Sequence, residues 1–405
     1  MCVLMFLLGA HAGYVNKEGK YFKKIESTKN HTDVLLSAKY AFAYARKHIV
    51  KHENNCQWPR GTYMIGLWEY YMATVEANVS DHYARADLSD WGRILDYKLC
   101  NQLSIWTGPC ATNNASSCAD NQLVGATFIE LYKAGLDLPL PHAESTLHSI
   151  TKEFDTEIEL GTATEGSWPI VDLSYMAMAP LARLAALTGN PKYFEKLWAN
   201  WNASMITARV TPSRTPLGAY GLFNQSDKLF MRDDKNLWHK GYWGRGNGWA
   251  MLGLVDVIRF GDATVVTTGV PDPHREYYIK IFKLFASRIL ELQGDDGAWR
   301  SSMLEASTFP TPDTTGSACF TLGLAYGINA GLLDKNTYGP AVTRAWEFLS
   351  QTAQLQSGRV GYCQHAAQAP TNDPALLNST TTSDFCVGMF LGAAAEVSRL
   401  FRAGG

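Results

Sequence analysis

Two kinds of helical segment alternate along this chain, and the alternation repeats six times. The first kind is amphipathic and covers residues 33–51, 80–99, 142–154, 191–206, 275–292 and 336–352. The second kind is apolar on nearly every face and covers residues 61–77, 121–133, 173–187, 247–260, 315–330 and 385–400. A helix that is apolar all round must be buried on all sides, whereas an amphipathic helix covers a core with one face. The pattern therefore predicts an all-α (α/α)6 barrel, with six inner helices wrapped by six outer ones.

This series of helices also indicates the domain organisation. The chain has 405 residues, of which 46% are hydrophobic, so it can bury one large core. No Pro/Ser-rich linker interrupts the series, and an open superhelical stack would need a short repeat that the sequence lacks. We expect a single catalytic domain over residues 25–405.

The charge and aromatic content restrict the class of ligand. The formal net charge is -2 and no run of five like charges occurs, which argues against nucleic acid and anionic membranes as partners. Twelve Trp and nineteen Tyr favour a polar ring-shaped ligand such as a sugar, because the apolar faces of sugars stack on aromatic rings. No CxxC or His-rich spacing occurs, so we expect no metal and no cofactor.

The N-terminus and the sequons bear on localisation. Residues 1–12 combine a short apolar run with Ala10-His11-Ala12, which has the form of a signal-peptidase site. N-glycosylation sequons occur at Asn30, Asn78, Asn114, Asn202, Asn224 and Asn378. These features favour a secreted glycoprotein. A cytoplasmic protein is the alternative, because no Lys or Arg precedes the apolar run. Secretion would permit local disulfides among Cys100, Cys110 and Cys118, and between Cys363 and Cys386.

Polar clusters stand at or just before the start of each apolar helix. They are Trp58-Pro59-Arg60-Gly61, Asp120-Asn121-Gln122, residues 168–172, residues 243–249, residues 313–317 and Thr382-Ser383-Asp384. Parallel inner helices would bring all six starts to one end of the barrel. The positive ends of six helix dipoles would then surround one cavity, which favours an anionic ligand such as a sugar with a carboxylate.

The aspartates in these clusters have two interpretations. Asp is a preferred N-cap residue, so each of them could serve only to satisfy free amide groups. Asp172 differs because it lies in an almost wholly apolar stretch, where burial raises a carboxyl pKa and leaves a proton available near neutral pH. We therefore predict Asp172 as a general acid and Asp120 as a second carboxylate that tunes it, and we interpret Asp313 and Asp384 as caps.

The cluster at residues 243–249 is the richest in binding chemistry. Its glycines allow close backbone approach, Arg245 offers a forked donor for a carboxylate, and Trp243 and Trp249 can sandwich a ring. The alternative is a glycine-rich helix start whose Trp side chains pack in the core and whose Arg pairs with an Asp. A phosphate loop is disfavoured, since the glycines follow no predicted strand. Trp58 either serves an outer subsite or packs the second helix, and we include Trp168 among the candidate binding residues.

These residues resemble a known family, the unsaturated rhamnogalacturonyl hydrolases of glycoside hydrolase family 105, which are related to the unsaturated glucuronyl hydrolases of family 88. The similarity runs from Trp58 to the C-terminus, and its most specific segments are residues 171–176, 243–249 and 313–331. The family's fold is the (α/α)6 barrel. The resemblance implies release of a 4,5-unsaturated galacturonic acid from the non-reducing end of pectin-lyase products. By match of motif, Asp172 would protonate C4 and direct water to C5, and Asp120 would support it.

The chain departs from that family's pattern at two places. Family members carry a His upstream of the acidic residue and another before the Trp/Arg/Trp segment, where this chain has residues 161–165 and 229–233 without a His. His239 lies nearby but is displaced, and Arg232 could substitute as a donor. Unsaturated glucuronyl substrates therefore stay open as an alternative. A sugar epimerase and a non-catalytic carbohydrate-binding protein are further alternatives on this fold.

Overall fold

The computed structural model describes residues 30–50, 57–96, 115–135, 143–159, 170–206, 221–233 and 242–403. The outer helices are α1 (His31–His48), α3 (His82–Asp96), α6 (Ala143–Glu159), α9 (Pro191–Trp201), α11 (Arg275–Glu291) and α13 (Lys335–Glu347). Short π-helical turns, η1 (Asn202–Ile206) and η3 (Phe348–Ala353), continue α9 and α13. The inner helices are α2 (Trp58–Glu76), α5 (Ala115–Lys133), α7 (Leu173–Met176) with α8 (Met178–Thr188), α10 (Gly244–Phe260), α12 (Thr314–Asn329) and α14 (Asp384–Arg402). Strands β1 (Phe223–Asn224) and β2 (Leu229–Phe230) form an antiparallel hairpin.

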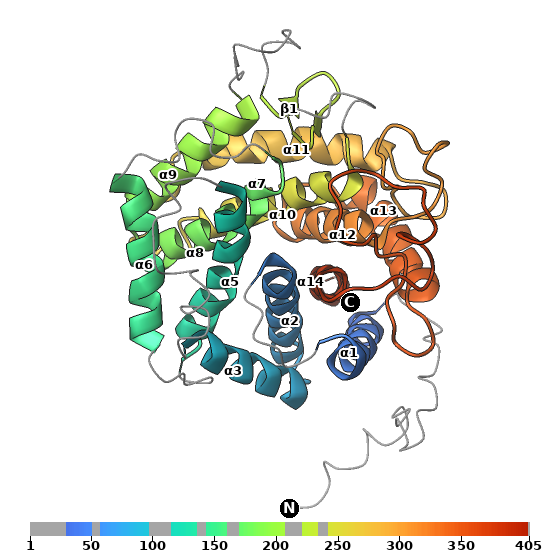
Figure 1. The fold of residues 1–405 in the computed structure, drawn as a ribbon, viewed down its shortest axis with the longest axis horizontal. Helices are drawn as coiled ribbons and strands as arrows, with labels where there is room; N and C mark the ends of the chain where they lie inside the picture. Colours follow the sequence, from blue (N-terminus) through green and yellow to red (C-terminus); the bar gives the residue numbers. More distant parts are fainter. Residues whose placement is uncertain are drawn as a thin grey trace, which may run out of the picture.

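The inner helices form a closed ring. Each packs on the next in the order α2, α5, α8, α10, α12 and α14, and α14 returns to pack on α2. The outer helices lie around this ring (Figure 1). The predicted (α/α)6 barrel is confirmed, and the open stack is excluded because the last helix packs on the first inner one.

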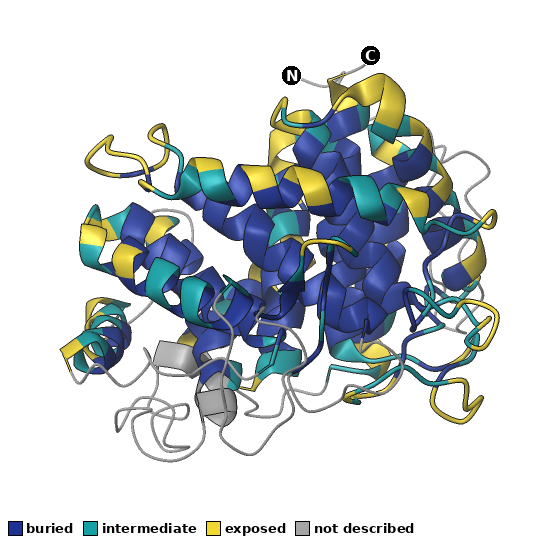
Figure 2. Cartoon of the chain, turned by 90° about the horizontal axis from the view of Figure 1, so that it is seen from above, coloured by how far each residue is buried: buried dark blue, intermediate teal, exposed yellow. Residues whose placement is uncertain are grey.

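Burial follows the two helix types of the sequence. The inner helices are buried almost throughout, while the outer helices expose one face (Figure 2). One predicted inner helix differs from expectation, because residues 173–188 divide into α7 and α8 at Ala177. Pro180 lacks the N–H that would bond the carbonyl one turn back, at Met176, and this accounts for the interruption. A second difference is that α5 begins at Ala115, so Asp120 lies in its second turn rather than before it.

The seam that closes the ring depends on glycine. A Cβ on Gly388 would lie 2.5 Å from the carbonyl oxygen of Thr62, and a Cβ on Gly66 would overlap the carbonyl of Gly388. The backbones of α2 and α14 therefore touch directly at this crossing. Side chains of any size at these two positions would push the helices apart and open the ring.

A buried ionic network lies where the inner helices end. Arg259 pairs with Glu69 at 3.0 Å and with Glu396, while Arg399 pairs with Glu69 at 3.1 Å and with Glu396 at 2.8 Å. Arg183 adds a pair to Asp256 at 2.7 Å. Cations near helix C-termini are favourable, because they offset the partial negative charge of the terminal carbonyls. The network thus joins α2, α8, α10 and α14 at the end of the barrel opposite the polar clusters.

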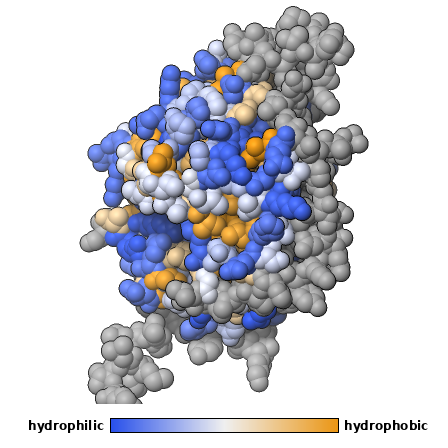
Figure 3. Space-filling model, turned by 90° about the vertical axis from the view of Figure 1, so that its left-hand side faces the viewer, coloured by the Kyte–Doolittle hydropathy of each residue, from blue (hydrophilic) through white to orange (hydrophobic). Residues whose placement is uncertain are grey.

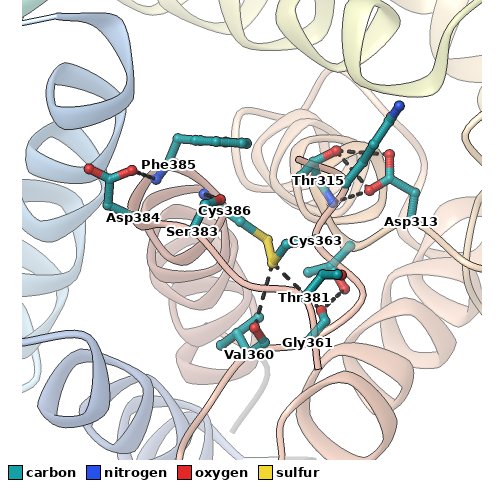
Figure 4. The surroundings of a disulfide bond; sticks show 12 residues. Asp313, Thr315, Val360, Gly361, Cys363, Thr381, Ser383, Asp384, Phe385 and Cys386 are labelled. Carbon is teal, nitrogen blue, oxygen red and sulfur yellow. Dashed lines mark hydrogen bonds between the residues drawn. A yellow bond between two sulfur atoms is a disulfide. The ribbon is translucent and has the colours of Figure 1, made fainter. Parts of the chain in front are cut away.

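The predicted bond between Cys363 and Cys386 is present. It joins the loop before α14 to the first turn of that helix, beside the start of α12 at Asp313 and Thr315 (Figure 4). The other predicted cysteine pairings lie outside the described residues or involve the side chain of Cys118, which is not described. The segment 1–12 with its predicted cleavage site also lies outside them, so localisation stays a prediction.

The coloured part of the face shown in Figure 3 is mainly polar. On the face shown in Figure 3, hydrophobic residues form small separate groups among hydrophilic ones. Within the described ranges, we find no helix with the length and apolar character needed to cross a bilayer.

Candidate active site

Asp172 stands at the start of α7 in a short turn that is tied to a neighbouring segment. Val171 N–H donates to the carbonyl of Arg232 at 2.8 Å, and Ile170 pairs with Asp233 in an antiparallel bridge. The side chain of Asp172 makes no capping hydrogen bond, and its backbone is already helical. The capping interpretation therefore does not apply to Asp172, whose Oδ2 is buried with no hydrogen-bond partner among the described residues.

Arg232 is the cation that faces this carboxylate. Its Nε lies 3.6 Å from Oδ2 of Asp172, and its Nη1 donates to Oδ2 of Asp233 at 2.7 Å. Within the described part of the chain, neither the Nε of Arg232 nor Oδ2 of Asp172 has a hydrogen-bond partner, although both atoms are buried. Buried polar atoms normally find partners. Two such atoms side by side suit a site that binds a water molecule or a substrate oxygen.

The electrostatics of the site leave a proton on its carboxyl groups. Burial raises the pKa of Asp172, while the charges of Arg232 and Arg245 oppose this rise. Burial and the nearby charge of Asp172 raise the pKa of Asp120 to about 7. Two interacting carboxyls share their titration, so the pair as a whole holds a proton near neutral pH. The structure thus brings the two predicted catalytic residues into electrostatic contact.

Arg245 is buried beneath a loop. Its exposed fraction is 1%, and it donates to the carbonyls of Gln364 at 2.7 Å and His365 at 3.0 Å. The guanidinium also lies 4.5 Å from the ring centre of Trp243. These contacts favour a role in fixing the loop after Cys363. The predicted role as a carboxylate clamp is untested, and Arg232 has the more available donor.

Aromatic side chains form a layer below the carboxylates. Trp249 stacks on Tyr175 with ring centres 5.5 Å apart, and Trp58 meets Trp249 edge-on at 5.8 Å. Trp58 is half-buried and also contacts Phe385, whereas Trp249 and Trp243 are buried. Trp243 donates its Nε1–H to Gln364 at 2.9 Å. Of the predicted stacking residues that the structure describes, Trp58 is therefore the most accessible to a sugar.

The remaining predicted residues have other positions. Asp313 caps α12 by accepting from Thr315 N–H, as expected. The cap of α14 is Ser383 instead, because its hydroxyl accepts from the N–H of Cys386, and Asp384 pairs with Arg60 at 3.4 Å. Trp168 and His239 lie outside the described residues.

The sequence pattern did not predict that two buried side-chain amides hold segments of the site in place. Asn247 and Gln364 are both fully buried. Asn247 binds both backbone groups of Phe230, whereas Gln364 donates to the carbonyl of Ala369 in its own loop and accepts from the Nε1–H of Trp243. Asn247 belongs to the predicted binding cluster, but its partners are about one helix turn and seventeen residues away in sequence. Nothing in a local pattern indicates such partners, although a polar amide in an apolar helix is a signal that it has some.

Comparison with known proteins identifies the family of this chain. The model of Glycosyl Hydrolase Family 88 matches residues 36–401. A curated unsaturated 3S-rhamnoglycuronyl hydrolase of Formosa agariphila is 34% identical over 265 residues, which cover 61% of this chain and 63% of that relative. The matched region thus spans less than two thirds of that relative's length.

Solved structures show the same fold. A polysaccharide lyase matches with a TM-score of 0.72 and 25% identity, over 92% of this chain and 98% of that one. A family 88 glycosyl hydrolase from Bacteroides vulgatus matches with a TM-score of 0.71 and 24% identity, over 92% and 99% of the two chains. Because the family model covers nearly the whole barrel, including the carboxylates and the cluster at residues 243–249, this chain belongs to glycosyl hydrolase family 88.

Proposed function

We propose that this chain hydrolyses oligosaccharides that end in a 4,5-unsaturated uronyl group. The observation that carries the proposal is the carboxyl of Asp172, which has no capping bond, has a buried Oδ2 without a partner among the described residues, pairs with Arg232 and acts electrostatically on Asp120. A buried carboxyl with a raised pKa can donate a proton near neutral pH, as the first step requires. Membership of family 88 supports the same reaction class.

The proposed reaction is a hydration followed by ring opening. Asp172 gives its proton to C4 of the double bond, and positive charge develops at C5 and the ring oxygen. Water adds at C5 and returns a proton to the Asp172 carboxylate, so the acid is regenerated. The resulting hemiketal opens to a ketone at C5, the hemiacetal left at C1 collapses to an aldehyde, and the next sugar leaves with the glycosidic oxygen, which takes up the hemiacetal proton. One water is consumed, and no bond forms between protein and sugar.

Arg232 has two tasks in this proposal. Its charge stabilises the Asp172 carboxylate after the proton has left. Its Nε–H, which has no partner among the described side chains, would bind the attacking water or the uronyl carboxylate. Asp120 keeps a negative charge or a shared proton near the reacting carbons and thereby opposes the loss of the acid's proton.

For the substrate, we propose an unsaturated uronyl group linked to rhamnose. The family resemblance suggested unsaturated galacturonic acid on rhamnogalacturonan fragments. The name of the Formosa agariphila relative, unsaturated 3S-rhamnoglycuronyl hydrolase, also contains rhamnose and a uronyl group. Unsaturated glucuronyl-rhamnose is therefore the principal competitor of unsaturated galacturonyl-rhamnose, and a panel of both decides between them.

A second candidate activity is that of a polysaccharide lyase. A lyase is among the solved structures that match, and its identity of 25% is similar to that of the matching hydrolase. The two reactions change the absorbance of the conjugated double bond in opposite directions, because a lyase creates this bond and the proposed hydrolase removes it. The uncapped Asp172, whose pKa is raised by burial, favours the hydrolase.

One assay tests the proposal. Absorbance of the conjugated double bond is followed with unsaturated galacturonyl-rhamnose, unsaturated glucuronyl-rhamnose and a saturated uronyl-rhamnose polymer. We expect absorbance to fall with an unsaturated disaccharide, and Asp172→Asn to lower kcat at least about a thousandfold. Asp272→Asn is the matched control, since Asp272 is also a buried carboxyl but lies at the opposite end of α10. Rising absorbance on the polymer would favour the lyase, and near wild-type turnover of Asp172→Asn would remove Asp172 from the mechanism.

A further inference from the structure

The side-chain amide of Asn247 makes hydrogen bonds to a segment outside its own helix. It lies in the first turn of α10 with an exposed fraction of 0%. Its Oδ1 accepts from Phe230 N–H at 2.9 Å, and its Nδ2 donates to the carbonyl of Phe230 at 2.9 Å. The same Nδ2 donates to the carbonyl of Trp243 at 3.0 Å. One side chain thus satisfies both backbone groups of a single residue in strand β2.

The segment held by Asn247 leads directly to the site. Two residues after Phe230 comes Arg232, whose carbonyl accepts from Val171 N–H. Met231 N–H donates to the carbonyl of Leu222 on the other side of the hairpin. The strand is therefore fixed at Phe230 by α10 and at Arg232 by the segment that carries Asp172. Between these two fixed points the backbone at Arg232 has little freedom to move, and the guanidinium is held at its end by Asp233.

Asparagine is an unfavourable choice at this position unless its amide is used. It is a weaker helix former than Ala or Leu, and burying its amide without partners costs free energy. Neither a carboxylate nor an aliphatic side chain can both donate to one backbone carbonyl and accept from the N–H of the same residue. The pairing with Phe230 is thus specific to an amide, and it crosses between two elements that otherwise have few hydrogen bonds in common.

We infer that Asn247 is a positioning residue, which fixes Arg232 beside Asp172 by holding strand β2 against the start of α10. The kinetic test of this inference rests on the proposed function. The structural part of the inference can be tested without a substrate, because the distance between the Arg232 guanidinium and the Asp172 carboxylate depends on Asn247 whatever the substrate is.

A double-mutant cycle with Asn247→Ala and Arg232→Ala tests the coupling. If Asn247 acts through Arg232, we expect Asn247→Ala to lower kcat/KM about tenfold or more in the enzyme that retains Arg232, since small displacements of positioned groups are costly. In the Arg232→Ala background the same change should cost less than about twofold. Equal losses in both backgrounds would overturn the inference and leave Asn247 with a purely structural role.

Further variants separate positioning from folding. Asn329→Ala is the matched control, because Asn329 donates its amide to Glu396 at the far end of α12, and its kcat/KM should stay near wild type. Asn247→Asp retains the acceptor for Phe230 N–H but sets a buried carboxyl against the carbonyls of Phe230 and Trp243, so its coupled loss should be at least as large as that of Asn247→Ala. If Asn247→Ala is insoluble, the cycle is run with Asn247→Ser, whose side chain is small and neutral, and the same additivity criterion applies.

A readout without activity distinguishes failure of this inference from failure of the proposed function. The carboxyl of Asp172 is titrated by ¹³C NMR of aspartate-labelled protein and assigned by its loss in Asp172→Asn. Asp120, Arg232, Asp233 and Arg245 are the charged groups that act on it or its neighbour. Arg232→Ala should raise this pKa, Asn247→Ala should raise it less, and the double variant should match Arg232→Ala. An unchanged pKa in Asn247→Ala would contradict the inference even if the enzyme is active on the panel.

Discussion

Aspartates near the inner helix starts separate by their hydrogen bonds. Asp313 accepts from the N–H and the hydroxyl of Thr315 and is a helix cap. Asp384 accepts from Phe385 N–H and pairs with Arg60. Asp172 makes no capping hydrogen bond, and among the described residues it pairs with Arg232 at 3.6 Å. Of these three aspartates, Asp172 is therefore the one whose Oδ2 is buried without a hydrogen-bond partner in the described part of the chain.

The carboxyl pair predicts the pH dependence of the reaction. With the Asp120 pKa raised to about 7, activity should fall as pH rises through about 7, where the pair loses its last proton. Asp120→Asn removes a like charge, so the remaining proton is lost more easily and this alkaline limb should move to lower pH. The measurement is kcat/KM against pH. A limb that stays in place would show that Asp120 does not tune the acid.

The same shift affects stability. The folded pKa of Asp120 lies above its ordinary value of 3.8, so ionisation is disfavoured in the folded state. Its contribution is present below about pH 4 and is lost as pH rises to about 7. Urea unfolding of the wild type should therefore show a decline over this window, and the decline should be smaller in Asp120→Asn.

Arg245 provides a contrast between binding and architecture. Its donors are used on the carbonyls of Gln364 and His365, so Arg245→Ala should leave these buried acceptors without partners. We expect a loss of about 3 kcal/mol in the free energy of unfolding, with KM changed less than kcat. Denaturant unfolding and steady-state kinetics measure the two effects. Unaltered stability together with a strongly raised KM would instead restore the predicted role as a carboxylate clamp.

At the scale of elements, function depends on how short segments are held. The turn at Asp172 is fixed by the hairpin that carries Arg232, and the hairpin is fixed by α10 through Asn247. The loop after Cys363 is held by a disulfide to α14 and by Arg245. In each case an inner helix supplies rigidity, and an irregular segment supplies the group that faces the site.

The seam between α2 and α14 gives a stability prediction for the elements. Gly388→Ala puts a methyl 2.5 Å from the backbone carbonyl of Thr62, which cannot rotate away. We expect a loss of about 2–4 kcal/mol, from overpacking against backbone. Gly339→Ala in α13 is the matched control, since apart from its chain neighbours a Cβ there would meet only the side chain of Lys335 at 3.8 Å. The gain in helix propensity is opposed by Pro340, which disfavours the helical conformation of the residue before it, so stability should change by less than about 1 kcal/mol. Equal effects in the two variants would show that the seam tolerates separation.

At the scale of the whole molecule, the barrel has two chemically distinct ends. The end at which the inner helices start holds the carboxylates, Arg232 and the aromatic side chains of the candidate site. The opposite end holds the network around Glu69 and Glu396, in which acidic and basic side chains pair with one another. Burial opposes ionisation of Glu69, yet Arg259 and Arg399 lower its pKa to about 2. Such a lowered pKa stabilises the fold above about pH 4.5, and the stabilisation is lost as pH falls toward about 2.

Because the ionic network and the candidate site lie at opposite ends of the barrel, we expect substitutions in the network to lower stability without lowering activity. Glu396→Gln keeps the shape of the side chain but leaves Arg259 and Arg399 with one fewer negative partner. We expect a loss of about 3 kcal/mol, as for other broken buried ion pairs, with kcat within about twofold of wild type. Glu276→Gln, whose side chain is 87% exposed, should change stability by less than about 0.5 kcal/mol. A large fall in kcat for Glu396→Gln would show that the two ends are coupled.

The sequence by itself determined the helix types and their order, and it predicted Asp172 as the candidate acid. Helices that are apolar all round can only be buried, so the alternation required an inner and an outer layer. An Asp in an apolar stretch indicated a raised pKa for the same reason. The tertiary structure alone decided the partners: Arg232 beside Asp172, Arg245 beneath a loop, Ser383 rather than Asp384 as a cap, and Asn247 on strand β2. Periodicity reports whether a side chain is buried, but a hydrogen bond or an ion pair depends on which distant segments the closed ring brings within about 3 Å of each other.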